Sequence, residues 1–147
     1  MCLIINKIST QTMLKSKSKT FNLYKAFRFN TFSLDRQYYI GSVFMDTRVN
    51  LTKNIYKSNY KGLYPKFSGE VHRGIHVYRG SDIMSIWRDY GMSHNTIVVK
   101  VFGDKEDLIA ASPTEAAFTK IYIPDSSLKQ LKDFLEQRTK LFKESRF

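Results

Sequence analysis

The stretch VHRGIHVY, residues 71–78, places mostly apolar residues at its odd positions and polar or aromatic residues at its even positions. This period of two is typical of a half-buried β-strand. Gly80 then breaks the run, and Ser81 stands where the N-cap of a helix belongs. Apolar residues spaced three and four apart predict a short helix over residues 81–90, which Gly91 ends. We expect the rest of the fold to form around this strand and helix.

Further strands are predicted before and after this centre. Aromatic and aliphatic residues alternate through 21–32 and recur in 38–45, which predicts two strands that pair with each other. Residues 96–102 are the richest in β-branched side chains and are expected to form a strand in the middle of the sheet. Residues 108–111 and 116–123 predict further short extended segments.

The last element predicted is a long C-terminal helix over residues 126–143, where leucine and phenylalanine recur at helical spacing. The expected fold is therefore α+β. It is a single domain over residues 1–147, with a mainly antiparallel sheet of about five or six strands and the long helix packed on one face.

Two segments show no clear period. Residues 9–19 are polar, rich in lysine and without glycine, so we interpret them as a solvated loop rather than a phosphate-binding loop. Residues 46–69 read as a loop-rich region, and long loops inside compact domains are often functional. Tyr56, Tyr60 and Tyr64 lie four apart, which leaves open a helix over residues 51–61 instead.

Composition narrows the class of protein. The chain has 147 residues, of which 42% are hydrophobic and 14% aromatic, as in a globular protein. No apolar run approaches the roughly 18 residues of a membrane span or forms the core of a signal peptide, so we expect a soluble protein without a membrane partner. Its one cysteine, Cys2, excludes an internal disulfide and fits a reducing compartment.

The net charge of +11 is the most marked property of the whole chain. Such a surface attracts phosphate polyanions and acidic proteins through long-range fields, although charge alone specifies no site. The binding surface predicted from the basic segments and the tyrosine-rich region consists of Lys15, Lys17, Lys19, Lys53, Tyr56, Lys57, Tyr60, Lys61, Tyr64 and Lys66, together with the terminal helix.

A family resemblance rests on several short motifs. The order GIHVY at 74–78, YG at 90–91, EDLIA at 106–110 and KIYIP at 120–124 resembles a small uncharacterised α+β domain of tailed phages and large DNA viruses. The opening MCLII and the stretch YKAF at 24–27 are similar to the front half of the same proteins. The resemblance implies a viral source, with the protein in the host cytoplasm or the virion. The family has no established activity, so no catalytic residue is implied.

The first functional hypothesis is therefore a non-catalytic viral accessory or virion-associated module that docks a protein or polyanionic partner through its basic surface. It leaves oligomerisation open. A nucleic-acid-binding protein is a further alternative. Lys25 and Arg28 beside Phe27 and Phe29 could form a stacking surface for single strands, although a core face is favoured for these aromatics.

An enzyme is the alternative of a different class. The chain distantly resembles ADP-ribosyltransferases, which implies that His76 holds a nucleotide, Tyr78 supplies the aromatic and Glu115 orients a sugar hydroxyl. The Ser-Thr-Ser and Glu-x-Glu elements of that family are missing, and structural roles for the three residues are favoured.

No metal and no cofactor are predicted. His72 and His76 share a strand face but lie too far apart on a straight strand to bind one ion. Asp104, Glu106 and Asp107 lack the ligand spacing of a calcium loop.

Overall fold

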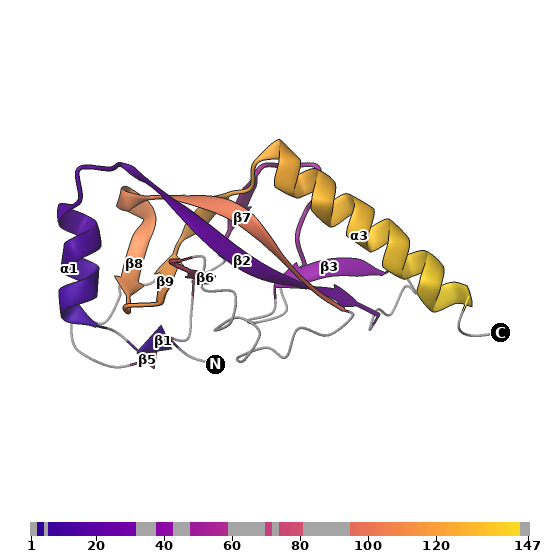
Figure 1. The fold of residues 1–147 in the computed structure, drawn as a ribbon, viewed down its shortest axis with the longest axis horizontal. Helices are drawn as coiled ribbons and strands as arrows, with labels where there is room; N and C mark the ends of the chain where they lie inside the picture. The colour runs from indigo at the N-terminus through magenta and orange to yellow at the C-terminus, as the bar shows by residue number, and fades with distance from the viewer. Residues whose placement is uncertain are drawn as a thin grey trace.

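The computed structural model describes residues 3–4, 6–31, 38–42, 48–58, 70–71, 74–80 and 95–144. The fold is α+β, as expected, with an antiparallel sheet between two described helices. Helix α1 (Lys7–Lys15) and helix α3 (Asp125–Glu144) lie toward opposite ends of the long axis (Figure 1). The strands of the main sheet are β2 (Thr20–Asn30), β3 (Tyr39–Ser42), β4 (Ile55–Lys57), β6 (Ile75–Tyr78), β7 (Thr96–Asp104), β8 (Leu108–Ala111), β9 (Glu115–Phe118) and β10 (Lys120–Tyr122).

The eight strands follow the order β4-β10-β7-β2-β6-β9-β8, and β3 pairs with β2 beside β6. One run of pairings joins β9 to β6, β6 to β2, β2 to β7, and β7 to β10. Only Thr119 separates β9 from β10 in the chain, so the two ends of this run are covalently joined and the sheet is rolled. Strands β1 (Leu3–Ile4) and β5 (Glu70–Val71) form a separate two-stranded sheet.

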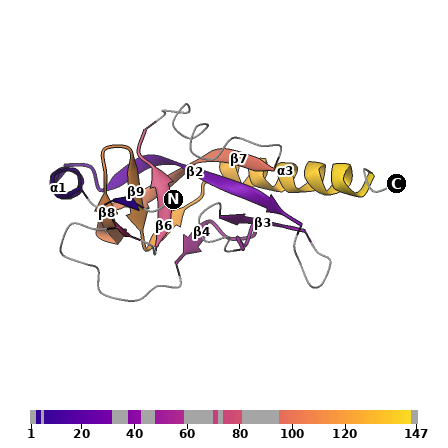
Figure 2. The ribbon, with the colours of Figure 1, turned by 90° about the horizontal axis from the view of Figure 1, so that it is seen from below.

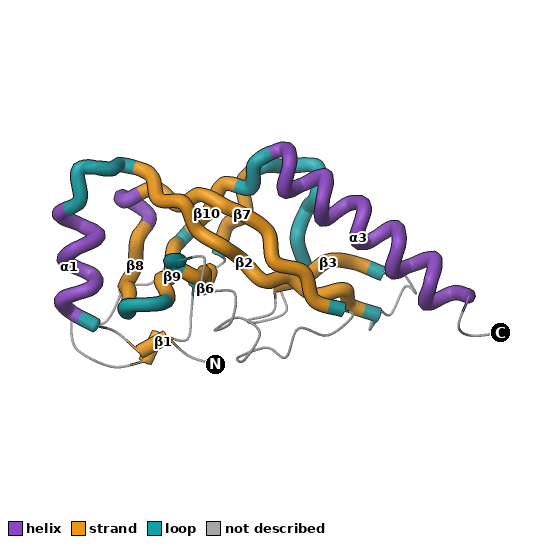
Figure 3. The backbone as a smooth tube through the Cα atoms, viewed as in Figure 1, coloured by secondary structure: helices purple, strands orange, loops and turns teal. Residues whose placement is uncertain are grey.

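Strands β2 and β7 form the backbone of the sheet. They pair from Thr20 opposite Asp104 to Arg28 opposite Thr96, and they cross the molecule side by side (Figure 3). Viewed from below, α3 runs alongside them toward the C-terminus (Figure 2). Its contacts are with β7 and β3. The helix therefore covers the sheet where β2, β3 and β7 extend beyond the rolled part.

Alternation along the strands separates an inner face from an outer face. The inner face and the apolar side of α3 form one core cluster, whose sheet residues include Leu23, Phe27, Ile75, Val77, Val99, Val101, Ala116, Phe118 and Ile121. Leu128 and Leu131 bring α3 into the same cluster. A second small cluster, Ala110 and Ala117 with Ile109, lies on the outer face of β8 and β9.

The interior is packed tightly at one glycine. A Cβ built on Gly103 of β7 would lie 2.7 Å from Cε1 of Phe118, whose ring is fully buried. The Phe118 ring thus occupies the space that a side chain at residue 103 would take. This contact joins β7 to the strand that closes the sheet.

Most of the predicted elements are confirmed. The segments 21–32, 96–102 and 126–143 correspond to β2, β7 and α3, and β7 is paired on both sides. The segment 38–45 contains β3, which pairs with β2 as predicted. The sheet has eight strands rather than five or six, and the helix predicted over 81–90 lies outside the described residues.

The predicted loop over residues 9–19 is wrong for residues 9–15, because α1 occupies residues 7–15, and is confirmed for residues 16–19. Asn6 caps the helix by accepting a hydrogen bond from the Ser9 N–H at 2.8 Å. The Ala111 N–H donates to Thr10 Oγ1 at 2.9 Å, and the Asn6 N–H donates to the Ala111 carbonyl at 2.9 Å. With Met13 as its only buried residue, this helix is attached to the edge of β8 largely by polar contacts and lacks a long apolar stripe.

Two further predictions need correction. The continuous strand over 71–78 is interrupted, since β5 ends at Val71 and β6 starts at Ile75, with Gly74 at a φ of 91° between them. All four residues of β6 are buried, so this strand is covered on both faces rather than half-buried. The alternative helix over 51–61 is wrong, because residues 55–57 form β4.

A charged side chain is enclosed in the core. Lys25 lies on the inner face of β2 between Leu23 and Phe27, and it is 2% exposed. Its Nζ is 5.9 Å from the centroid of the Phe27 ring. Burial lowers the pKa of Lys25 from 10.5 to about 7, because the apolar surroundings disfavour the ammonium form.

We expect Gly103→Ala to destabilise the protein by about 1–3 kcal/mol, because the added methyl group forces the buried Phe118 ring to move. Urea unfolding measures this loss. The control is the same substitution in a Phe118→Leu background, where the ring is absent and the added cost of Gly103→Ala should shrink. Strictly additive costs would show that the two residues do not interact.

We expect the free energy of unfolding to rise with pH between about 7 and 10.5, because unfolded Lys25 binds a proton in this range that the folded protein does not. Lys25→Met should remove this pH-dependent term, on the order of 4 kcal/mol across the range, and should stabilise the protein near pH 7. Urea unfolding at several pH values provides the measurement. Lys17→Met, the same change at an exposed residue, is the control. Parallel curves for the wild type and Lys25→Met would contradict the expectation.

Candidate functional site

The positive charge is concentrated in the first half of the chain. Residues 1–79 hold 14 lysines and arginines against 3 acidic residues, whereas residues 80–147 hold 10 of each. Within the described stretches 6–31 and 48–58 there are nine cations and no acidic residue, and all of these cations except Lys25 are exposed. Helix α3 carries five cations and four acids, so it contributes little net charge.

One part of the outer face is open. We call it the open face; it spans β4, β10, β7 and β2 and consists of Asn22, Tyr24, Arg28, Ile55, Lys57, Lys100, Phe102, Lys120 and Tyr122. These residues are exposed or half-buried, in contrast to the buried residues of the inner face. The open face therefore presents side chains of four neighbouring strands to solvent.

An apolar row crosses the open face. Ile55 lies opposite Tyr122, and Tyr122 lies opposite Phe102. Ile55 is 50% exposed and Tyr122 is 47% exposed. The Tyr122 and Phe102 rings have centroids 6.3 Å apart and planes tilted by 36°. A hollow of about 110 Å³ borders this row, so the rings lie at a concave part of the surface.

Cations lie on both sides of the apolar row. Lys57 and Lys120 are directly opposite each other on β4 and β10. On the other side, Lys100 holds its Nζ 5.7 Å from the centroid of the Phe102 ring. Like charges directly opposite across two strands are destabilising unless an anion compensates them. The open face thus combines half-exposed rings with three lysines, and Asp104 and Asp107 lie at the end of the hollow that Lys120 also lines.

Acidic side chains border this surface at one end. Asp104, Glu106 and Asp107 have carboxylate oxygens within 4.8 Å of one another at the turn between β7 and β8. Asp104 accepts a hydrogen bond from Thr20 Oγ1 at 3.0 Å, and Asp107 accepts one from Thr119 Oγ1 at 3.3 Å. Two of the three carboxylates therefore have local structural partners.

The predicted basic residues are only partly gathered at the open face. Lys57 belongs to it, whereas Lys53 lies exposed before β4. Lys15, Lys17 and Lys19 are exposed at the end of α1 and in the segment leading into β2.

The tyrosines of the predicted surface behave differently. Tyr56 is 8% exposed and packs in the core, with its ring 6.4 Å from that of Phe27. Tyr60, Lys61, Tyr64 and Lys66 lie outside the described residues. Tyr56 thus stabilises the junction of β4 with the core instead of facing a partner.

The stacking surface considered around Phe27 and Phe29 is on the buried side of β2. Phe27 is fully buried and Phe29 is 3% exposed, so neither ring is accessible to a base. Arg28, which has the opposite parity, lies on the open face. The favoured interpretation of these phenylalanines as core residues is confirmed.

The register brings the three enzyme candidates to one face of the sheet. Tyr78 of β6 is directly opposite Glu115 of β9, and His76 shares the outer face two residues away. His76 is 7% exposed and Tyr78 is 5% exposed, while Glu115 is half-buried. The arrangement puts an imidazole, a phenol and a carboxylate on adjacent strands, but the two rings are almost entirely buried.

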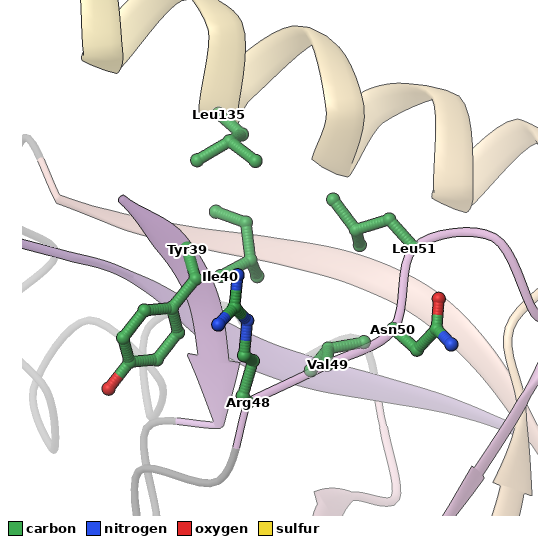
Figure 4. A pocket seen from close by; sticks show the side chains of 7 residues that line it. All are labelled: Tyr39, Ile40, Arg48, Val49, Asn50, Leu51 and Leu135. Atoms are coloured by element: carbon green, nitrogen blue, oxygen red, sulfur yellow. The ribbon is translucent and has the colours of Figure 1, made fainter. Parts of the chain in front are cut away.

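A separate pocket lies between β3 and α3. It has a volume of about 460 Å³, and Leu135 points from α3 toward Ile40 and Leu51 at its apolar floor (Figure 4). At its rim the Arg48 guanidinium carbon is 5.1 Å from the centroid of the Tyr39 ring. One cation stacked on one ring provides affinity for an anion or a flat group, but no acid–base pair for catalysis.

Most of the open face was not predicted from the sequence. Lys100, Phe102, Lys120 and Tyr122 lie in segments predicted only as strands, at positions that alternate with the buried residues of β7 and β10. That parity is the signal that could have identified them. Knowing that the two strands are neighbours required the structure.

Comparisons with known proteins do not assign this chain to a family. None of the described helices is long and apolar enough to cross a membrane. No protein-family model, no curated protein and no solved structure matches the chain.

Proposed function

We propose that this protein is a non-catalytic interaction module that docks a polyanionic partner on its open face. The observation that carries the proposal is the direct opposition of Lys57 and Lys120 across β4 and β10, with the exposed Lys100 on the other side of the apolar row. Holding like charges in register costs free energy in the unbound protein. A bound anion would compensate that cost, and the released counterions would add to the affinity.

Packing supports the choice of this face. The inner face is filled by the core cluster and α3, and the outer edge of β8 is covered by α1. The open face keeps half-exposed apolar side chains in contact with water. Exposed apolar groups framed by polar residues are typical of binding surfaces. The role within a virus or virion implied by the family resemblance is part of the same proposal.

The test uses inorganic polyphosphate as the probe and isothermal titration at two salt concentrations. We expect the triple variant Lys57→Gln, Lys100→Gln, Lys120→Gln to bind at least about tenfold more weakly. We also expect its affinity to depend less on salt, because fewer counterions are released.

The control is a variant with the same change in net charge on α3, namely Lys129→Gln, Lys132→Gln, Lys140→Gln. These lysines are exposed but lie away from the open face. It should bind nearly as well as the wild type. Equal losses in the two triple variants would mean that polyphosphate responds to net charge alone, and the proposal of a docking face would be wrong.

A second candidate, a nucleotide-using enzyme resembling an ADP-ribosyltransferase, is favoured by the placement of His76, Tyr78 and Glu115 on one face. If it holds, the protein should release nicotinamide from NAD, and Glu115→Gln should abolish the release while leaving the urea unfolding curve almost unchanged. No release by the wild type at millimolar NAD would exclude this candidate. The burial of both rings makes it the less favoured of the two.

A further inference from the structure

We infer that the polyanion recognised by the open face is single-stranded nucleic acid, with bases stacked on Tyr122 and Phe102 and backbone phosphates held by Lys57, Lys100 and Lys120. This inference rests on the proposed docking function and specifies its ligand.

The first reason is the placement of the rings. Docking of phosphates alone needs cations and no aromatic groups, yet the cations here frame a row of rings. Tyr122 is 47% exposed, and Phe102 on the neighbouring strand is half-buried, with its ring centroid 6.3 Å away. Aromatic side chains on an open sheet with cations beside them are the usual platform for unpaired bases.

The second reason is the order of groups across the strands. Lys57 and Lys120 face each other on one side of the row, and Lys100 lies on the other side. A single strand laid along the row can place its bases on the rings while its phosphates reach cations on a flank. Lys100 already lies over the Phe102 ring at 5.7 Å, so a cation and a π-surface are preassembled.

The third reason excludes a duplex as the best ligand. In a duplex the bases are stacked on one another and only the phosphates and groove edges are accessible. The exposed rings of the sheet could then contribute nothing to binding. Single strands gain both the electrostatic and the stacking contributions, whereas duplexes and polyphosphate gain the electrostatic contribution alone.

Lys17 and Lys19 lie beyond the acidic end of the open face, where Asp104 is opposite Thr20. Both are exposed in the segment that leads into β2 at Thr20, and the Lys105 N–H donates to the Lys19 carbonyl at 2.8 Å, which ties this segment to the end of β7. A single strand would have to pass Asp104, which is opposite Thr20, to reach these lysines. The expected footprint is therefore the ring row with Lys57, Lys100 and Lys120.

The experiment measures fluorescence anisotropy with three labelled probes of equal length: an oligothymidine, an abasic strand with the same backbone, and a duplex. We expect the oligothymidine to bind at least about tenfold more tightly than the abasic strand, because each stacked base adds to the affinity. Tyr122→Leu should reduce this preference at least about fivefold, whereas Tyr122→Phe, which keeps the ring, should retain it.

The possible results separate the inference from the function on which it rests. Equal binding of the oligothymidine and the abasic strand, with loss in the Lys57, Lys100 and Lys120 triple variant, would overturn the single-strand inference and leave polyanion docking intact. Tighter binding of the duplex that is unaffected by Tyr122→Leu would also overturn it. No binding of any probe or of polyphosphate would overturn both proposals.

Discussion

The rolled shape of the sheet is held by the contact between Phe118 and Gly103. The chain bends at Thr119, so that β9 pairs with β6 and β10 pairs with β7, and the Phe118 ring fills the space above Gly103 at this bend. Without the bend the sheet would be open, and its inner face would need another cover. Because the sheet closes here, strand alternation assigns every residue of β2 and β7 either to the sealed interior or to the outer face.

That assignment explains why one molecule has both a buried cation and an exposed aromatic row. Lys25 alternates in step with Leu23 and Phe27, so its side chain lies in the interior. Burial there disfavours its ammonium form. Phe102 has the parity opposite to that of Val101 and is therefore outside. Both features contradict the simple rule that charges are exposed and rings buried, and both cost free energy in the isolated protein. They lie on opposite faces of adjoining strands in one sheet.

The sequence was sufficient for elements with strong internal periodicity. The strands β2 and β7 and the helix α3 were predictable because packing on one apolar side imposes a period of two or 3.6. Helix α1 was not, since its attachment depends on Thr10 bonding to Ala111, a residue about a hundred positions away. Strand β4 has only three residues, and its pairing with β10 rather than any local pattern makes it a strand. The number of strands was underestimated for the same reason.

The candidate site was less predictable than the fold, because its residues come together only through the pairing of separate strands. Ile55, Tyr122 and Phe102 come from three strands separated by loops and a turn, and nothing local relates them. A stacking surface around Phe27 and Phe29 was the less favoured interpretation of the sequence, and both residues are in the core. The chemistry of that hypothesis reappears on the opposite face of the same sheet. A row of half-exposed rings flanked by lysines keeps apolar surface in water, and the proposed ligand, with both flat apolar groups and negative charges, would cover that surface.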